Sequence, residues 1–181
     1  MESNMNALVL FSGGLDSTTS LAIAKSMGYK ITALTINYKQ RHDYEIIASK
    51  KIISNYSDVK HIIFDIDLTK IGGSALTDSS LDVPTEESAG IPITYVPARN
   101  TIFLSIAASY AETLKIKNIF IGVNAIDYSG YPDCRPKFIA SFEKMINLGT
   151  KSASEGSPFK ILTPLVSMTK SEIINTGIKL G

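Results

Sequence analysis

Short apolar runs alternate with amphipathic stretches along most of the chain. An unbroken apolar run bounded by turn residues is typical of a strand buried on both faces of a parallel sheet, whereas apolar residues three and four apart favour a helix. The runs predict strands over residues 6–11, 30–37, 61–66 and 118–124, with a short fifth strand at 160–162. The helical spacing predicts helices over residues 17–27, 43–56, 100–114, 137–148 and 169–180.

The apolar positions also predict which side chains of the first two helices face inward. These are Leu21, Ile23, Ala24 and Met27 in the first helix and Ile46, Ile47, Ile52 and Ile53 in the second. Because strands and helices alternate, the chain is expected to form right-handed βαβ units. The predicted fold is therefore α/β, a doubly wound open parallel sheet of about five strands.

Two irregular stretches interrupt the alternation. Residues 67–98 hold several Gly, Pro, Ser and Thr residues, and residues 125–136 form a second break. An irregular segment as long as 67–98 inside a compact domain is usually functional. We therefore expect residues 67–98 to close over a bound substrate.

Composition narrows the class of protein mainly by exclusion. The chain has 181 residues, 44% of them hydrophobic, which is enough for a single domain with a sizeable core. Its formal net charge of +1 gives no reason to expect a nucleic-acid or membrane-surface partner. Cys134 is the single cysteine, so it forms neither an internal disulfide nor a zinc site by itself and indicates a reducing compartment. The N-terminal apolar run is too short for a signal peptide or a membrane span, so a soluble cytoplasmic protein is expected.

The segment from Ser12 to Thr18, SGGLDST, carries the clearest chemical signal, because it joins a predicted buried strand to a predicted helix. Its two glycines let the backbone approach a ligand closely, and the N–H groups at the helix start favour an anion such as phosphate. Ser12, Ser17 and Thr18 can add hydroxyl donors, and Asp16 can hold a Mg²⁺ ion that neutralises a polyphosphate. The plainer alternative is a tight glycine turn with Ser17 as a helix cap.

The string SGGxDS in this context resembles the phosphate loop of the N-type ATP pyrophosphatase (PP-loop) family, which has an adenine nucleotide alpha hydrolase-like fold. It lacks the Gly-Lys-Ser/Thr ending of a Walker A loop. The resemblance implies cleavage of ATP between the α and β phosphates, adenylation of a carbonyl or carboxyl oxygen, and displacement of AMP by a nitrogen or sulfur nucleophile. The residues it implies for ATP binding are Phe11, Ser12, Gly13, Gly14, Leu15, Asp16, Ser17, Thr18, Thr19 and Leu21.

Further motifs indicate which PP-loop enzymes the chain resembles most. They are Asn37-Tyr38, Gln40-Arg41-His42, the segment Val96 to Thr101, and residues 122–125 and 127–136. Together they resemble the 7-cyano-7-deazaguanine synthase family. This implies conversion of 7-carboxy-7-deazaguanine to the nitrile with ammonia and two ATP, on the way to the tRNA base queuosine. Lys39 stands where the family usually has glycine, which predicts a differently shaped loop.

The resemblance implies a role for each of a set of polar residues. The implied catalytic residues are Asp16, Ser17, Arg99 and Lys170, and the implied substrate-binding residues are Arg41, His42, Asn100, Asp127, Tyr128, Tyr131, Asp133 and Arg135. At the start of a predicted helix, Arg99 can meet a phosphate or the substrate carboxylate. The alternatives are a surface ion pair for Arg99 and a helix cap for Asn100.

The other implied roles also have alternatives. The tyrosines can stack on a flat base, and a carboxylate can accept the ring N–H and exocyclic amine of a guanine-like edge, whereas Gly130 and Pro132 also fit an ordinary turn. His42 can accept a proton from ammonium, or it is an exposed loop histidine. Lys170 can reach phosphates, or it is a solvated surface lysine.

The resemblance also implies ATP and Mg²⁺, and a homodimer. It implies a zinc-binding cysteine cluster just beyond the last predicted helix, and the chain ends at Gly181 before that position, so no metal ligand is assigned. Cys134 is then structural or substrate-lining, with sulfur transfer a minor alternative. Two other functions stay open. One is another amidating or thiolating PP-loop enzyme, such as the ATPase domain of GMP synthetase or NAD synthetase, and the other is a regulatory module that binds ATP without turnover.

Overall fold

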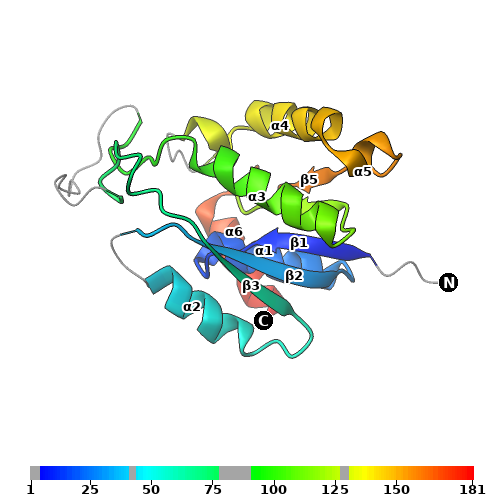
Figure 1. Ribbon diagram of the computed structural model, residues 1–181. Helices are drawn as coiled ribbons and strands as arrows, with labels where there is room; N and C mark the ends of the chain where they lie inside the picture. Colours follow the sequence, from blue (N-terminus) through cyan, green and yellow to red (C-terminus); the bar gives the residue numbers. More distant parts are fainter. Residues whose placement is uncertain (1–4, 41–43, 78–90, 127–130) are drawn as a thin grey trace.

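Five parallel strands form the centre of the molecule. Figure 1 shows the computed structural model, which describes residues 5–40, 44–77, 91–126 and 131–181. The strands lie in the order β3-β2-β1-β4-β5. Their bounds are β1 (Asn6–Leu10), β2 (Lys30–Asn37), β3 (Lys60–Asp65), β4 (Asn118–Phe120) and β5 (Lys160–Leu162). Because β4 pairs with the central β1 rather than with β3, the chain reverses its winding there, and the predicted doubly wound open sheet is confirmed.

Helices cover both faces of the sheet. Their bounds are α1 (Leu15–Ser26), α2 (Tyr44–Ile53), α3 (Arg99–Thr113), α4 (Pro136–Gly149), α5 (Lys151–Ser154) and α6 (Lys170–Leu180), with a 3₁₀ turn η1 (Pro132–Cys134). In Figure 1, α3 and α4 lie above the strands and α2 lies below them. The last helix, α6, packs against α1. Within the described ranges, no helix combines the length and the apolar character needed to cross a bilayer.

Alternate residues of the central strand fill two hydrophobic cores. Leu8 and Leu10 of β1 belong to the core shared with α3 and α4, whereas Ala7 and Val9 belong to the core shared with α1 and α2. Both sets are buried. This burial on two faces explains why the strand is an unbroken apolar run in the sequence.

The observed elements differ from the predicted ones mainly at their ends. β4 is shorter than the predicted 118–124, because residues 121–124 leave the strand and line the pocket described below. α1 begins at Leu15, before the predicted start, because Gly14 already serves as its N-cap. The sequence reasoning missed α5 and η1, which are too short for a helical period to be visible.

Two residues expected to face inward are exposed. Met27 is 48% exposed because it is the C-cap residue, where α1 has already ended. Ile47 is 61% exposed because α2 instead buries Ser49, which contacts the loop after β1. The inward prediction was therefore wrong at both positions.

The predicted irregular segment is confirmed where it is described. Residues 67–77 and 91–98 contain turns but neither helix nor strand. They are nonetheless packed, because Leu68, Ala75 and Val96 are at most 2% exposed. Residues 78–90 lie outside the described residues, so closure of this segment over a substrate stays a prediction.

Candidate functional site

A pocket of about 550 Å³ lies at the carboxyl ends of β1, β2 and β4. This is the point where the winding of the sheet reverses, and open α/β sheets bind their ligands at such a point. The lining residues come from seven parts of the chain and are Leu10, Phe11, Ser12, Gly14, Asp16, Ser17, Leu34, Ile36, Tyr38, Glu45, Arg99, Asn100, Phe103, Ile121, Gly122, Val123, Asn124, Tyr131, Cys134 and Lys170.

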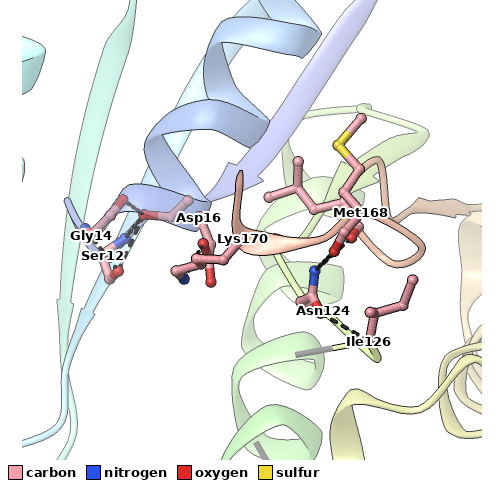
Figure 2. A network of polar contacts seen from close by, with 9 residues as sticks. Ser12, Gly14, Asp16, Asn124, Ile126, Met168 and Lys170 are labelled. Carbon is pink, nitrogen blue, oxygen red and sulfur yellow. Dashed lines mark hydrogen bonds and ion pairs between the residues drawn. The ribbon is translucent and has the colours of Figure 1, made fainter. Parts of the chain in front are cut away.

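Serine hydroxyls hold the loop after β1 in a compact turn (Figure 2). The backbone N–H of Ser12 donates to Ser17 Oγ at 3.1 Å, and Ser17 Oγ donates to the Gly14 carbonyl, also at 3.1 Å. Gly14 at the N-cap has no side chain to cap α1. The first N–H groups of a helix lack intrahelical acceptors, so this end of the pocket suits an anion.

Two glycines allow neighbouring elements to approach the loop closely. Gly13 has φ +82°, and a Cβ there would lie 2.6 Å from the backbone nitrogen of Ser49 in α2. A Cβ on Gly122, just after β4, would lie 2.9 Å from the backbone carbon and oxygen of Asp16. The loop is thus held between α2 and the chain leaving β4.

An ion pair joins the loop to the last helix. Lys170 Nζ lies 2.9 Å from Asp16 Oδ1, and Figure 2 shows the two side chains pointing toward one another. Asn124 positions the chain before α6, because its side-chain amide donates to the carbonyl oxygens of Leu165 and Met168. Asn124 thus holds the segment before α6 in place, and Lys170 at the start of α6 reaches the loop from there.

The other end of the pocket is built around Arg99. Its guanidinium carbon lies 6.0 Å from the ring centre of Tyr38 and 5.7 Å from that of Tyr131, and Nη1 donates to the Tyr38 hydroxyl at 3.4 Å. Burial lowers the pKa of Arg99, but Tyr38, Tyr131 and Glu45 nearby outweigh it and raise that pKa overall. Arg99 therefore stays charged, so it can bind an anion or a carbonyl oxygen.

Hydrogen bonds continue from Arg99 along the pocket wall to Glu45. The Tyr38 hydroxyl donates to Gln40 Oε1, and the Gln40 side chain is hydrogen-bonded to the Glu45 carboxyl. Burial raises the pKa of Glu45, although Arg99 and Gln40 lower it in part. Burial likewise raises the pKa of Tyr38 against the opposing effect of Arg99.

Asp133 binds the start of α3 instead of facing the pocket. Its Oδ2 accepts from the backbone N–H of Asn100 at 3.0 Å, and its backbone carbonyl accepts from Asn100 Nδ2 at 3.2 Å. Asp133 is 5% exposed and is not among the lining residues. Asn100 also donates to Cys134 Sγ at 3.4 Å, and both of these residues line the pocket.

The structure brings many of the predicted site residues together and separates others. Those that line the pocket are Phe11, Ser12, Gly14, Asp16, Ser17, Arg99, Asn100, Tyr131 and Lys170. Gly13 of the loop does not line the pocket, and neither do Leu15 and Thr18 at the start of α1. Thr19 and Leu21 are buried at 2% and 0% exposure. Arg135 is exposed before α4. Arg41, His42, Asp127 and Tyr128 lie outside the described residues.

Several lining residues had no role in the sequence prediction. Tyr38 and Asn124 lay within the family-like motifs, which was the available signal for them. Glu45 and Phe103 look like ordinary positions of a predicted helix, and only the fold shows that they reach the pocket.

Zinc does not fit the described residues. In the parts of the chain that the structure describes, no group of three or more His, Cys, Asp or Glu side chains is placed to hold a metal ion. Mg²⁺ has a different requirement, because it usually binds through one or two carboxylates together with substrate phosphates. Asp16 at the loop satisfies that requirement.

The sheet order, the glycine loop after the central strand and the pocket at the reversal point define a doubly wound α/β protein with a ligand pocket at the switch point of its sheet. Sequence comparison narrows this class. The chain belongs to the family described as queuosine biosynthesis protein QueC, which matches residues 6–181.

Curated relatives agree with this assignment. The chain is 54% identical over 179 residues to the 7-cyano-7-deazaguanine synthase of Saccharophagus degradans, covering 99% of this chain and 80% of that protein. It is also 54% identical to the 7-cyano-7-deazaguanine synthase of Cellvibrio japonicus, with the same coverage.

Solved structures support the fold. A 4-thiouridine synthetase in complex with RNA and bound ATP has a TM-score of 0.62 at 19% identity, covering 100% of this chain and 42% of that one. A predicted subunit of tRNA methyltransferase from Methanocaldococcus jannaschii has a TM-score of 0.61 at 20% identity, covering 96% and 74%. The NH₃-dependent NAD synthetase of Campylobacter jejuni has a TM-score of 0.52 at 15% identity, covering 99% and 65%. At these identities the likeness concerns the fold alone.

Proposed function

We propose that this chain converts 7-carboxy-7-deazaguanine and ammonia to 7-cyano-7-deazaguanine in an ATP-dependent reaction that releases AMP and pyrophosphate. The supporting observation is one continuous pocket with a phosphate-type loop at one end and a half-buried arginine near two tyrosine rings at the other. Such a pocket can hold the nucleotide and a flat, charged base side by side. Family membership and the names of the curated relatives agree with this reaction.

The chemistry requires two activations of the same carbon. A carboxylate oxygen is a poor leaving group, so it first attacks the α-phosphorus of ATP and pyrophosphate departs. Ammonia then adds to the acyl carbon and AMP leaves, which gives the amide. A second ATP adenylates the amide oxygen, and loss of AMP and two protons leaves the C≡N bond.

Named residues fit these steps. The N–H groups of the loop and the start of α1 would bind the departing pyrophosphate, and Lys170 would add a positive charge there. Asp16 would hold Mg²⁺, which neutralises phosphate charge when it is bound. Arg99 would bind a phosphate or the substrate carboxylate, and Tyr131 would stack on the base.

The proposal extends to the setting of the enzyme. We expect it to act in the cytoplasm as a homodimer on a free base, without a nucleic-acid or membrane partner. We assign no step to zinc, because the described residues contain no group that fits it.

The test is turnover with ATP, Mg²⁺, ammonium and 7-carboxy-7-deazaguanine, followed by assays for AMP and pyrophosphate and by mass spectrometry of the base. A base product with the mass of the nitrile is expected. About two AMP and about two pyrophosphate should form for each nitrile. Parallel reactions with nicotinic acid adenine dinucleotide or xanthosine monophosphate test other amidating PP-loop activities. Turnover of either of these, without turnover of the deazaguanine, contradicts the proposal.

A further inference from the structure

The pocket contains two described carboxylates, and they lie at different ends of it. Asp16 belongs to the phosphate-type loop, where Lys170 pairs with it at 2.9 Å. Glu45 comes from α2 and lies near Tyr38 and Arg99. Asp133, which the sequence offered as a base-binding carboxylate, instead accepts from the backbone of α3. Among the described residues, Glu45 is therefore the lining carboxylate away from the loop.

Helix geometry directs Glu45 toward the pocket. Residues four apart lie on the same face of a helix, and Glu45 is four residues before Ser49. The Ser49 backbone packs directly against Gly13 of the loop. The face of α2 that carries Glu45 is thus the face turned to the site, whereas Ile47 is exposed on another side.

Glu45 is held in place by neutral groups. The side chain of Gln40 is hydrogen-bonded to its carboxyl, and Gln40 in turn accepts from the Tyr38 hydroxyl. Arg99 donates its described side-chain hydrogen bond to Tyr38. A carboxylate has about four lone-pair sites, so the amide of Gln40, its hydrogen-bond partner among the described residues, leaves Glu45 with capacity for a ligand that donates two hydrogen bonds.

A 7-deazaguanine base presents such a pair of donors. Its ring N–H and exocyclic amine point in parallel from the pyrimidine edge, and one carboxylate can accept both in charge-assisted bonds. Tyr131 supplies an aromatic surface beside this edge, and its hydroxyl lies 3.0 Å from Thr94 Oγ1. With the pyrimidine edge at Glu45, the carboxyl on the five-membered ring is turned toward the loop.

We propose that Glu45 determines specificity by accepting hydrogen bonds from the ring N–H and the exocyclic amine of the 7-deazaguanine base. This inference rests on the proposed function and adds the residue that distinguishes a 2-amino base from one without the amine. A site built to accept a particular N–H group discriminates strongly against an analogue that lacks it.

The test compares 7-carboxy-7-deazaguanine with its analogue lacking the 2-amino group, in the wild type, Glu45→Gln and Glu45→Asp. The wild type is expected to prefer the 2-amino base in kcat/KM by about a hundredfold or more. Glu45→Gln should reduce this preference to about tenfold or less, mainly by raising KM for the base, with KM for ATP unchanged. Glu45→Asp keeps the carboxylate and should retain the preference with weaker binding.

Asp127→Asn is the matched variant, because Asp127 is the other acidic candidate from the sequence. A Glu45→Gln enzyme that keeps the full preference overturns the inference, and so does loss of the preference in Asp127→Asn alone. If the wild type turns over neither base, the proposed function fails. Equilibrium binding of the two bases to the wild type and Glu45→Gln then decides the inference separately, and a preference that does not depend on Glu45 overturns it.

Discussion

The ion pair between Asp16 and Lys170 is partly exposed, at 33% and 51% of the two side chains, so its contribution to stability is small. Such pairs contribute about 0–1 kcal/mol. Its position is more informative, because it places one charge of each sign beside the loop that would bind polyphosphate. We therefore expect the pair to contribute more to ligand binding than to the free energy of folding.

Replacing Asp16 with alanine should separate these two contributions. We expect Asp16→Ala to lower pyrophosphate release by about a hundredfold or more, because a carboxylate that positions the bound metal is lost. The free energy of unfolding should change by less than about 1 kcal/mol. Asp58→Ala is the matched control, since Asp58 forms an exposed ion pair with Lys25 outside the pocket lining. Similar activity in the two variants would contradict a role for Asp16 in catalysis.

Asp133 is the opposite case, a polar residue that is expected to contribute mainly to the stability of the fold. Because its buried Oδ2 accepts the Asn100 N–H, Asp133→Ala should lower the free energy of unfolding by about 1–3 kcal/mol in a denaturant titration. Asp133→Asn keeps an acceptor oxygen and should lose less. Equal losses in the two variants would show that this hydrogen bond does not account for the effect.

At the scale of elements, the packing of α2 against the loop makes Gly13 essential. Its φ of +82° disfavours any other residue, and a Cβ would collide with the backbone of Ser49, which cannot move without moving α2.

Gly28 provides a direct comparison, because its φ is +83° and a Cβ there meets nothing within 4 Å. Gly28→Ala should therefore cost about 1 kcal/mol in the free energy of unfolding, which is the backbone cost alone. Gly13→Ala should cost at least about 1 kcal/mol more, because overpacking is added, and it should weaken ATP binding as well. Calorimetry of the two variants checks this, and equal losses would mean that α2 does not pack on the loop as described.

The elements were predictable to different degrees from the sequence. Strands buried on both faces, such as β1, are unbroken apolar runs bounded by glycines or polar residues, so their positions followed directly. The end of β4 was not predictable, because the apolar run continues into residues that line the pocket instead of the sheet. Likewise, the sequence identified the Ser12–Thr18 loop, but not Glu45 or the role of Asp133, which depend on contacts between distant segments.

At the scale of the whole molecule, the pocket lies where β1 and β4 meet, so a ligand there contacts both halves of the sheet. Gly122 lets the chain leaving β4 lie close to the loop, because a Cβ there would be 2.9 Å from the backbone carbon and oxygen of Asp16. A ligand that binds only the folded chain raises its stability, by about 2.7 kcal/mol at a hundred times Kd.

ATP with Mg²⁺ should therefore raise the Tm of the wild type, and Gly122→Ala should lose most of this increase because the added methyl displaces the loop. Gly149→Ala is the matched control, since a Cβ at this last residue of α4 meets nothing within 4 Å. Thermal denaturation with and without nucleotide measures the effect. An undiminished increase in Gly122→Ala would show that the loop tolerates displacement.

The contact between Asp16 and Lys170 spans 154 positions of the chain. A ribosome adds about 5–20 residues per second, so several seconds or more separate the synthesis of the loop from that of its lysine. During that time the loop exists without the charge that completes it. The pair with Lys170 can therefore form only after the five strands and the helices from α1 to α5 have been synthesised.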